Sequence, residues 1–454
     1  MSSSPLSISA YSEYASVNYT ENKDIYGLVS IATRGEINVI KRASIDLVCV
    51  IDVSGSMAGE KLKLVKESLV FITNQLKDND RLAVVTFGSR VDLTYDLNSM
   101  NESNKKVLKT EVIPKINTHG CTNLSGGLFK GLSLLLERDT PNPVSTVILF
   151  TDGDANEGET DADKLVSTIN SYKRNPSMEN VSIFSFGVGT DHKASFLQSI
   201  SSTGTGVYYY IENQDKITTA FKGCIDGLMS VVAQDINVTI KSMSPDKDTV
   251  KYVSISAPKI KVQSTPSKFM FGVGDLFLEE TRDIPFVLSL SNRDKEEFDN
   301  TFEVQVQYVD ILSSQLCTET VILKIYRSST TTYSDDKSRS NIDVNRNRVD
   351  TVTALRSADE FARKGDIEEA REVLRLAHEK VCRSFSTDDS IVENMKRDLL
   401  NTMLTLKDKH TYVSTGEKDV VSKFTQYETQ RSTALSDENR TVTTWKGSNR
   451  SVKK

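Results

Sequence analysis

Five oxygen-bearing side chains, spread over three segments of the chain, have the types and the spacing of a divalent-metal site. Asp52, Ser54 and Ser56 alternate within one Asp-Val-Ser-Gly-Ser segment, so a single loop can aim three oxygens in the same direction. Thr122, in a second polar segment, adds a hydroxyl, and Asp152, in a third, adds another carboxylate. The three segments together predict a site built from oxygen ligands.

The ligand types favour a hard metal ion. Hydroxyl and carboxylate oxygens select Mg²⁺, Mn²⁺ or Ca²⁺ over zinc or copper, and few carboxylates among neutral ligands suit Mg²⁺, which keeps waters in its shell. A carboxylate that acts only through water leaves the ion strongly electrophilic, so an Asp or Glu of a protein partner can complete the octahedron. We therefore expect a Mg²⁺-dependent protein-binding site, with Gly55, Gly120 and Asp154 on its rim.

Each carboxylate follows a segment that predicts a buried strand. The apolar run Ile45–Ile51 directly precedes Asp52, and Thr146–Phe150 ends just before the loop that contains Asp152. Ligands of open α/β sheets bind at the carboxyl ends of the strands, so both carboxylates are expected at one edge of a sheet. Gly55 permits the tight backbone path that the first loop needs.

The region 44–232 alternates between strand-like and helix-like segments. Such repeated units predict an α/β domain whose mostly parallel sheet carries helices on both faces. The expected strands lie at 45–51, 82–87, 91–95, 146–150, 181–186 and 207–211, and the expected helices at 60–77, 124–136, 162–173, 194–200 and 215–232.

The flanking regions predict further parts of the fold. Short alternating runs between polar turns at 233–327 indicate an antiparallel β-sandwich. The segment 16–43 predicts strands at 25–32 and 36–40 that could complete this sandwich, which would make the α/β domain an insertion in a β framework. The other expectations are a loose N-terminal tail at 1–15, a linker at 328–342, a helical region at 343–408 and a flexible tail at 409–454.

At the three polar segments the sequence resembles the von Willebrand factor type A family. The family pattern, the metal-ion-dependent adhesion site, is Asp-x-Ser-x-Ser, then a Thr, then an Asp, and all five positions are present as Asp52, Ser54, Ser56, Thr122 and Asp152. The resemblance covers roughly 44–232 and includes the order of strands and helices. It implies a doubly wound, Rossmann-like domain whose hydroxyls contact the metal directly, while its carboxylates often act through water.

The arrangement around this region is similar to that of intracellular relatives. In those proteins a type A domain is followed by a β-sandwich and a helical stretch, and the type A domain acts as an interaction module. The resemblance therefore implies a protein that binds other proteins in the cytoplasm.

Composition argues against several other classes of protein. The net charge of −6 does not favour binding to nucleic acid or to an anionic membrane, both of which attract positively charged proteins. No apolar run is long enough to span a membrane. The N-terminus lacks the basic start and apolar run of a secretory signal. Five scattered cysteines without a Cys-x-x-Cys pair argue against a disulfide framework or a zinc site, so we expect a cytoplasmic location.

Two other functions stay open beside metal-dependent binding. The metal could only stabilise the fold of a structural scaffold, in which the β-sandwich and helices make the contacts. Alternatively, Asp52 could be the nucleophile of a Mg²⁺-dependent phosphoryl hydrolase, which needs a second acid–base group and cationic side chains. Lys61 and Lys63 lie nearby, but Ser54 stands where the second carboxylate is needed. We therefore expect no enzyme.

Overall fold

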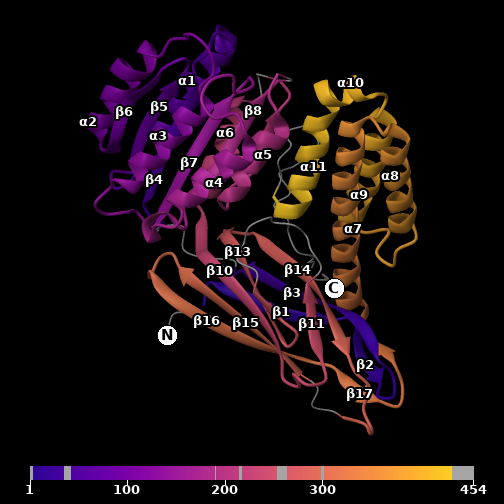
Figure 1. The fold of residues 1–454 in the computed structure, drawn as a ribbon. Helices are drawn as coiled ribbons and strands as arrows, with labels where there is room; N and C mark the ends of the chain where they lie inside the picture. Colours follow the sequence, from indigo (N-terminus) through magenta and orange to yellow (C-terminus); the bar gives the residue numbers. More distant parts are fainter. Residues whose placement is uncertain are drawn as a thin grey trace, which may run out of the picture. The chain divides into compact units, whose positions relative to one another are not determined.

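The computed structural model describes residues 4–34, 42–189, 191–213, 217–252, 263–297 and 301–431. The chain divides into two units. The α/β unit holds the described residues between Asn38 and Val231 together with those from Val413 onward, and the sandwich unit holds the rest. Figure 1 shows the α/β unit in indigo to magenta, with its last helix, α11 (Glu417–Thr429), in yellow.

The α/β unit is built on one six-stranded sheet with the order β6-β5-β4-β7-β8-β9. Its fully buried central strand β4 pairs in parallel with β5 and β7, and only β6 runs antiparallel to its neighbour. The strands are β4 (Ile45–Asp52), β5 (Arg81–Phe87), β6 (Val91–Ser99), β7 (Val144–Thr151), β8 (Ser182–Val188) and β9 (Tyr208–Ile211). The predicted α/β class and its mostly parallel sheet are thereby confirmed.

Helices cover this sheet in two groups. The helices α3, α4 and α5 pack side by side, α1 packs against α6, and α11 packs on α5 and β9. The long helices are α1 (Glu60–Gln75), α3 (Leu124–Leu136), α4 (Ala162–Tyr172), α5 (Ala194–Thr203), α6 (Ile217–Leu228) and α11 (Glu417–Thr429). The short ones are η1 (Gly55–Met57), α2 (Glu102–Val107), η2 (Leu108–Val112), η3 (Ile113–Lys115) and η4 (Pro176–Met178).

A glycine sets the distance between α3 and the central strand. A Cβ atom built on Gly131 would lie 2.8 Å from Cγ2 of Val50 and 3.3 Å from Cγ1 of Val48, both on β4. Helix α3 can therefore lie this close to the sheet because residue 131 has no side chain.

The sandwich unit consists of two antiparallel sheets, ordered β1-β3-β14-β11 and β12-β13-β10-β15-β16, and a small sheet β17-β2-β18. Apolar side chains from both large sheets form one continuous core. The early strands are β1 (Leu6–Ser12), β2 (Tyr14–Asn18), β3 (Lys23–Thr33), β10 (Val231–Ser242), β11 (Thr249–Tyr252) and β12 (Gln263–Thr265). The later ones are β13 (Lys268–Phe277), β14 (Thr281–Leu290), β15 (Thr301–Asp310), β16 (Gln315–Lys324), β17 (Tyr326–Ser328) and β18 (Thr332–Tyr333).

A helical hairpin completes the sandwich unit. Helix α7 packs on β1, β3 and β14 and also contacts α8 and α9. Gly365 ends α7 in the left-handed conformation, with φ of 104°, and so turns the chain into α8. The helices are α7 (Asp336–Lys364), α8 (Ile367–Cys382), α9 (Ser390–Thr405) and α10 (Lys409–Thr411). The turn η6 (Tyr412–Gly416) follows, and with Val413 the chain returns to the α/β unit. In the described residues, no helix is both long enough and apolar enough to cross a membrane.

Three boundaries differ from those that the sequence suggested. The expected loose tail at 1–15 contains β1, which pairs with β3 from Leu6 to Ser12, because its alternate residues Leu6, Ile8 and Ala10 pack on the core. The expected linker at 328–342 contains the start of α7, whose first turn is polar and is capped by the Asp335 side chain. The expected flexible tail at 409–454 contains α11.

Helix α11 is amphipathic, and this explains why the segment forms a helix rather than the expected flexible tail. Its buried side chains Val420, Val421, Phe424 and Tyr427 recur at helical spacing in a sequence otherwise rich in polar residues. The strand expected at 36–40 and the tail beyond residue 431 lie outside the described residues.

Candidate metal centre

Three loops meet at the carboxyl edge of β4 and β7, and backbone hydrogen bonds tie them together. The first loop joins the second through two bonds, Gly55 N to Gly120 O at 3.2 Å and His119 N to Val53 O at 2.6 Å. The third loop joins the second where Asn156 N donates to Thr122 O at 3.2 Å. The polar segments that the sequence singled out are therefore adjacent in space.

Asp52 is the buried anchor of the first loop. Its Oδ1 accepts a hydrogen bond from Ser54 N at 2.8 Å, and its Oδ2 accepts one from the Thr151 hydroxyl at 2.5 Å. Burial raises the pKa of Asp52 to about 6, against the effect of these hydrogen bonds, and the negative charge of Asp152 adds to the rise. The two carboxylates are therefore close enough to repel each other.

Asp152 connects to the serines of the first loop. The Ser56 hydroxyl donates to its Oδ1 at 2.8 Å, and the hydroxyls of Ser54 and Ser56 lie 3.1 Å apart. The other oxygen, Oδ2, forms an ion pair with the Lys61 ammonium. Hydrogen bonds thus join four of the five expected ligands, Asp52, Ser54, Ser56 and Asp152.

Thr122, the fifth expected ligand, is buried on the neighbouring loop. Its backbone N–H donates to Asn156 Oδ1 at 2.8 Å, and Asn123 caps α3 directly after it. Within the described part of the chain, no hydrogen bond joins the Thr122 hydroxyl to the other four side chains. The backbone of Thr122 is held next to the third loop by its two bonds with Asn156.

The expected rim residues differ in their surroundings. Gly55 and Asp154 are exposed, and Asp154 lies 3.7 Å from the Lys193 ammonium. Gly120 has a positive φ of 65°, and a Cβ atom there would lie 2.3 Å from the Ser89 hydroxyl. Gly120 is also exposed, and its positive φ shows that the turn requires a glycine there.

The donor set fits a hard divalent cation. Two fully buried carboxylates and three hydroxyls occupy one edge of the sheet, and Lys61 contributes a single positive charge against two negative ones. Among the described residues there is no group of three or more His, Cys, Asp or Glu side chains that could hold a metal. The oxygen-rich edge therefore suits Mg²⁺, Mn²⁺ or Ca²⁺ by its chemistry.

Three residues of the site were not predicted as parts of it. Thr151 donates to Asp52, Asn156 holds the Thr122 backbone, and Lys61 pairs with Asp152. The sequence carried a signal for Lys61, which stands in the first turn of α1, just after the serine loop. Thr151 belongs to the third polar segment, but no pattern indicated that it would bind Asp52, and Asn156 gave no signal. Polar residues beside a loop are common, and only the fold shows which of them bind each other.

Sequence comparison identifies the α/β region. Residues 46–223 match the profile of the von Willebrand factor type A domain, so the resemblance in that region is confirmed. Inter-alpha-trypsin inhibitor heavy chain H1 of Mesocricetus auratus is 30% identical over 199 residues, which are 42% of this chain and 21% of that protein. The chain spans about a fifth of the length of the curated relatives it matches.

Solved structures resemble the chain over most of its length. A von Willebrand factor type A protein from Catenulispora acidiphila has a TM-score of 0.64 at 16% identity and covers 88% of this chain and 90% of its own. The ArnB paralog VWA2 from Sulfolobus acidocaldarius has a TM-score of 0.56 at 18% identity, with coverage of 93% and 98%. At these identities the likeness concerns the fold alone.

Proposed function

We propose that this von Willebrand factor type A domain binds one divalent ion, Mg²⁺ in the cell, and uses it to hold a carboxylate of a partner protein. Asp52, Ser54, Ser56, Thr122 and Asp152 would hold the ion. The observation that carries the proposal is the pair of fully buried carboxylates, Asp52 and Asp152, linked by hydrogen bonds to serine hydroxyls.

The charge balance of the site supports a cation there. Two buried carboxylates in close proximity are unfavourable unless positive charge is near them, and Lys61 neutralises only one. A divalent ion supplies the missing charge and, when bound, offers open coordination positions to an oxygen ligand. Domains of this type typically serve as metal-dependent protein interaction modules.

The exposed side of the site supports a partner's access to the ion. Ser56 and Gly55 are exposed, whereas Asp52 and Asp152 lie beneath them. With the ion and Lys61 in place, two positive groups face two carboxylates and leave a net charge of about +1 by formal count. A partner's Asp or Glu suits that charge better than a neutral side chain does.

A stabilising metal without partner binding is the second candidate. The complete burial of both carboxylates fits this role as well, because a metal there would tie three loops of the domain together. Phosphoryl hydrolysis has less support, because both Asp52 oxygens accept hydrogen bonds and are poorly placed to attack a substrate. We propose binding without catalysis.

We also propose a reducing compartment, such as the cytoplasm. All five cysteines, Cys49, Cys121, Cys224, Cys317 and Cys382, are free thiols in the structure. Alkylation of the unfolded protein, isolated from its native source without reductant, should modify all five. A protected pair would place the protein in an oxidising compartment.

Calorimetric titration of Mg²⁺ and Mn²⁺ into the full chain tests the metal site. One site is expected in the wild type, and both Asp52→Ala and Asp152→Ala should weaken it more than about tenfold. Asp163→Ala, which removes an exposed carboxylate on α4, is the matched control and should leave the affinity unchanged. A wild type that binds neither ion would refute the proposal.

Water-proton relaxation with bound Mn²⁺ separates the two candidates. An ion with open positions carries exchangeable waters, and a peptide containing a single aspartate should displace them, whereas its asparagine analogue should not. If Mn²⁺ binds but neither peptide changes the relaxation, the metal only stabilises the fold.

A further inference from the structure

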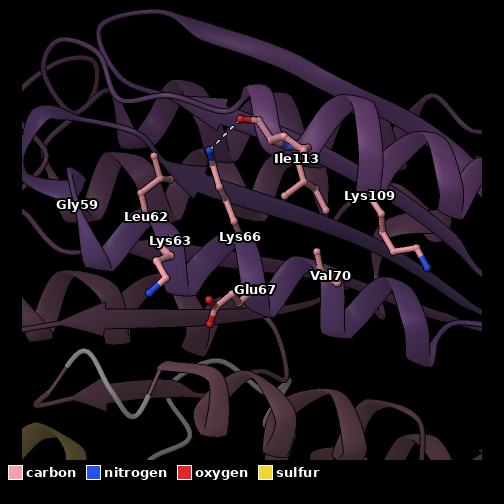
Figure 2. A pocket seen from close by; sticks show the side chains of 9 residues that line it. Gly59, Leu62, Lys63, Lys66, Glu67, Val70, Lys109 and Ile113 are labelled. Carbon is pink, nitrogen blue, oxygen red and sulfur yellow. Dashed lines mark hydrogen bonds between the residues drawn. The ribbon is translucent and has the colours of Figure 1, made fainter.

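A groove on the α/β unit lies apart from the metal ligands. It has a volume of about 510 Å³ and runs between α1 and the turn that contains η2 and η3. Figure 2 shows its lining, from Gly59 at the start of α1 to Val70, with Lys109 and Ile113 on the opposite wall. None of the five expected metal ligands lines it.

The floor of the groove is apolar. Leu62 and Ile113 present buried side chains to it, and Val70 is half-buried at its far end. At the other end Gly59 has no side chain, and a Cβ built there would meet no atom within 4 Å. The groove is therefore open at the Gly59 end and can accept apolar side chains along its length.

The walls of the groove are basic. Lys63, Lys66 and Lys109 line it against the single carboxylate of Glu67. The Lys66 ammonium donates to Pro114 O at 3.1 Å, drawn as the dashed line in Figure 2, and the Lys109 ammonium donates to Asn74 Oδ1 at 2.9 Å. Both acceptors are neutral.

These two ammonium charges are not compensated locally. Lys63 pairs with Glu60 at 2.9 Å, but in the part of the chain that the structure describes neither Lys66 nor Lys109 forms an ion pair. The chain as a whole carries a net charge of −6, so this basic groove is opposite in sign to the protein around it. An acidic ligand would be repelled elsewhere and attracted here.

The lining distinguishes between acidic ligands. A nucleic acid or another phosphate polymer would place its charges against Glu67 and would leave the apolar floor without a partner. A peptide whose carboxylates alternate with apolar side chains satisfies both the walls and the floor. The length of α1 from Gly59 to Val70, about 16 Å, suits roughly three turns of a helical segment.

We infer that this groove is a docking site for an acidic, amphipathic segment of a partner protein. The apolar side chains of the segment enter the groove over Leu62 and Ile113, and its carboxylates pair with Lys66 and Lys109. This contact needs no metal ion, so it does not rest on the function proposed for the adhesion-type site.

Fluorescence anisotropy of a labelled peptide, titrated with the full chain, tests this inference. The probe is a peptide of about twelve residues with leucines on one helical face and glutamates elsewhere. It should bind equally in Mg²⁺ and in chelator, and also to Asp152→Ala, so a failure of the metal site stays separate from a failure of the groove. Replacing its glutamates by glutamines, or its leucines by serines, should weaken binding.

Charge reversal of the groove gives the deciding comparison. The double variant Lys66→Glu and Lys109→Glu should bind the probe at least about tenfold more weakly. Lys164→Glu, which reverses an exposed lysine on α4, should bind as the wild type does. If the reversed variant misfolds by circular dichroism, Lys66→Gln and Lys109→Gln replace it. Unchanged binding by the folded variant, or no binding by the wild type, would overturn the inference.

Discussion

At the scale of single residues, Lys61 adds a positive charge to the proposed metal site. Its ammonium pairs with Asp152, whose carboxylate is fully buried, and it comes from the first turn of α1 rather than from any of the three loops. The ammonium neutralises part of the charge that a metal would otherwise neutralise. Lys61 should therefore weaken metal binding while keeping the site positive toward a partner.

Replacing Lys61 by methionine tests this role. In chelator, Lys61→Met should lower the free energy of unfolding by about 1–2 kcal/mol, a figure reduced because the lysine is partly exposed. Its affinity for Mg²⁺ should rise about tenfold, since a repulsive charge is gone. Denaturation in chelator and calorimetry measure the two effects, and Lys61→Arg should behave like the wild type. Weaker Mg²⁺ binding would show instead that Lys61 positions Asp152.

His192 supplies a pH dependence that is separate from the metal. It is buried, and its Nε2 lies 2.7 Å from the Tyr208 hydroxyl. Burial, together with the nearby Lys418 charge, lowers the pKa of His192 to about 3. An unfolded histidine has a pKa of about 6.5. Between the two pKa values the unfolded chain therefore binds a proton at His192 that the folded chain does not bind. Its contribution to stability is complete above pH 6.5 and is lost as the pH falls toward 3.

The pH dependence of unfolding measures this contribution. Between pH 6 and pH 4, His192 should add up to about 1.4 kcal/mol per pH unit to the slope of the unfolding free energy. His192→Gln should reduce that slope, whatever its effect at neutral pH. Equal slopes in the two proteins would mean that the folded state accepts the proton.

At the scale of elements, the site depends on how closely helices approach the strands that carry it. Helix α3 begins at Leu124, two residues after Thr122, and Gly131 lets it lie against the strand that ends at Asp52. The contact between α3 and β4 therefore fixes the relative position of two of the three loops of the candidate site. A small change in this contact should affect both the fold and the metal site.

Two glycine-to-alanine changes separate packing from helix propensity. Gly131→Ala should destabilise the protein by about 1–3 kcal/mol, because its Cβ meets the β4 valines, although alanine favours a helix. Gly223→Ala on α6 is the matched control, since a Cβ there meets no atom within 4 Å, and it should stabilise by up to about 1 kcal/mol. Denaturant unfolding compares them, and effects of the same sign would contradict this account.

At the scale of the whole molecule, the chain leaves the α/β unit, builds the sandwich and the helical hairpin, and returns to the α/β unit as α11. Helix α11 packs on α5 and β9, and the Glu417 carboxylate accepts a hydrogen bond from Ser195 N, at 3.4 Å, in the first turn of α5. Lys193, the N-cap residue of α5, makes no capping hydrogen bond through its own side chain. A segment more than two hundred residues away in sequence therefore completes this helix.

The variant Phe424→Ala tests whether α11 is an integral part of the α/β unit. Removing this buried side chain should lower the stability by about 3 kcal/mol. Hydrogen exchange should become faster in β9 and α5. Asp419→Ala, which removes an exposed carboxylate paired with Lys423, should cost less than about 0.5 kcal/mol. Unchanged exchange in β9 and α5 would show that α11 is dispensable there.

The sequence by itself predicted the α/β class, the order of most strands and helices in 44–232, and the residues proposed as metal ligands. This was possible because apolar runs such as Ile45–Ile51 are buried on both faces, and because Asp52 and Asp152 directly follow such strands. The signals are local: a strand, its end, and the polar residues just beyond it.

The tertiary structure decided what depends on contacts distant in the sequence. The pair of Lys61 with Asp152, the bond from Thr151 to Asp52, and the groove between α1 and η3 all join segments that no local pattern connects. The N-terminal strand β1 and helix α11 were missed for the same reason. Both segments are short, and they are stabilised mainly by packing on a sheet or on helices that are distant in the sequence. A local sequence pattern does not reveal that stabilisation.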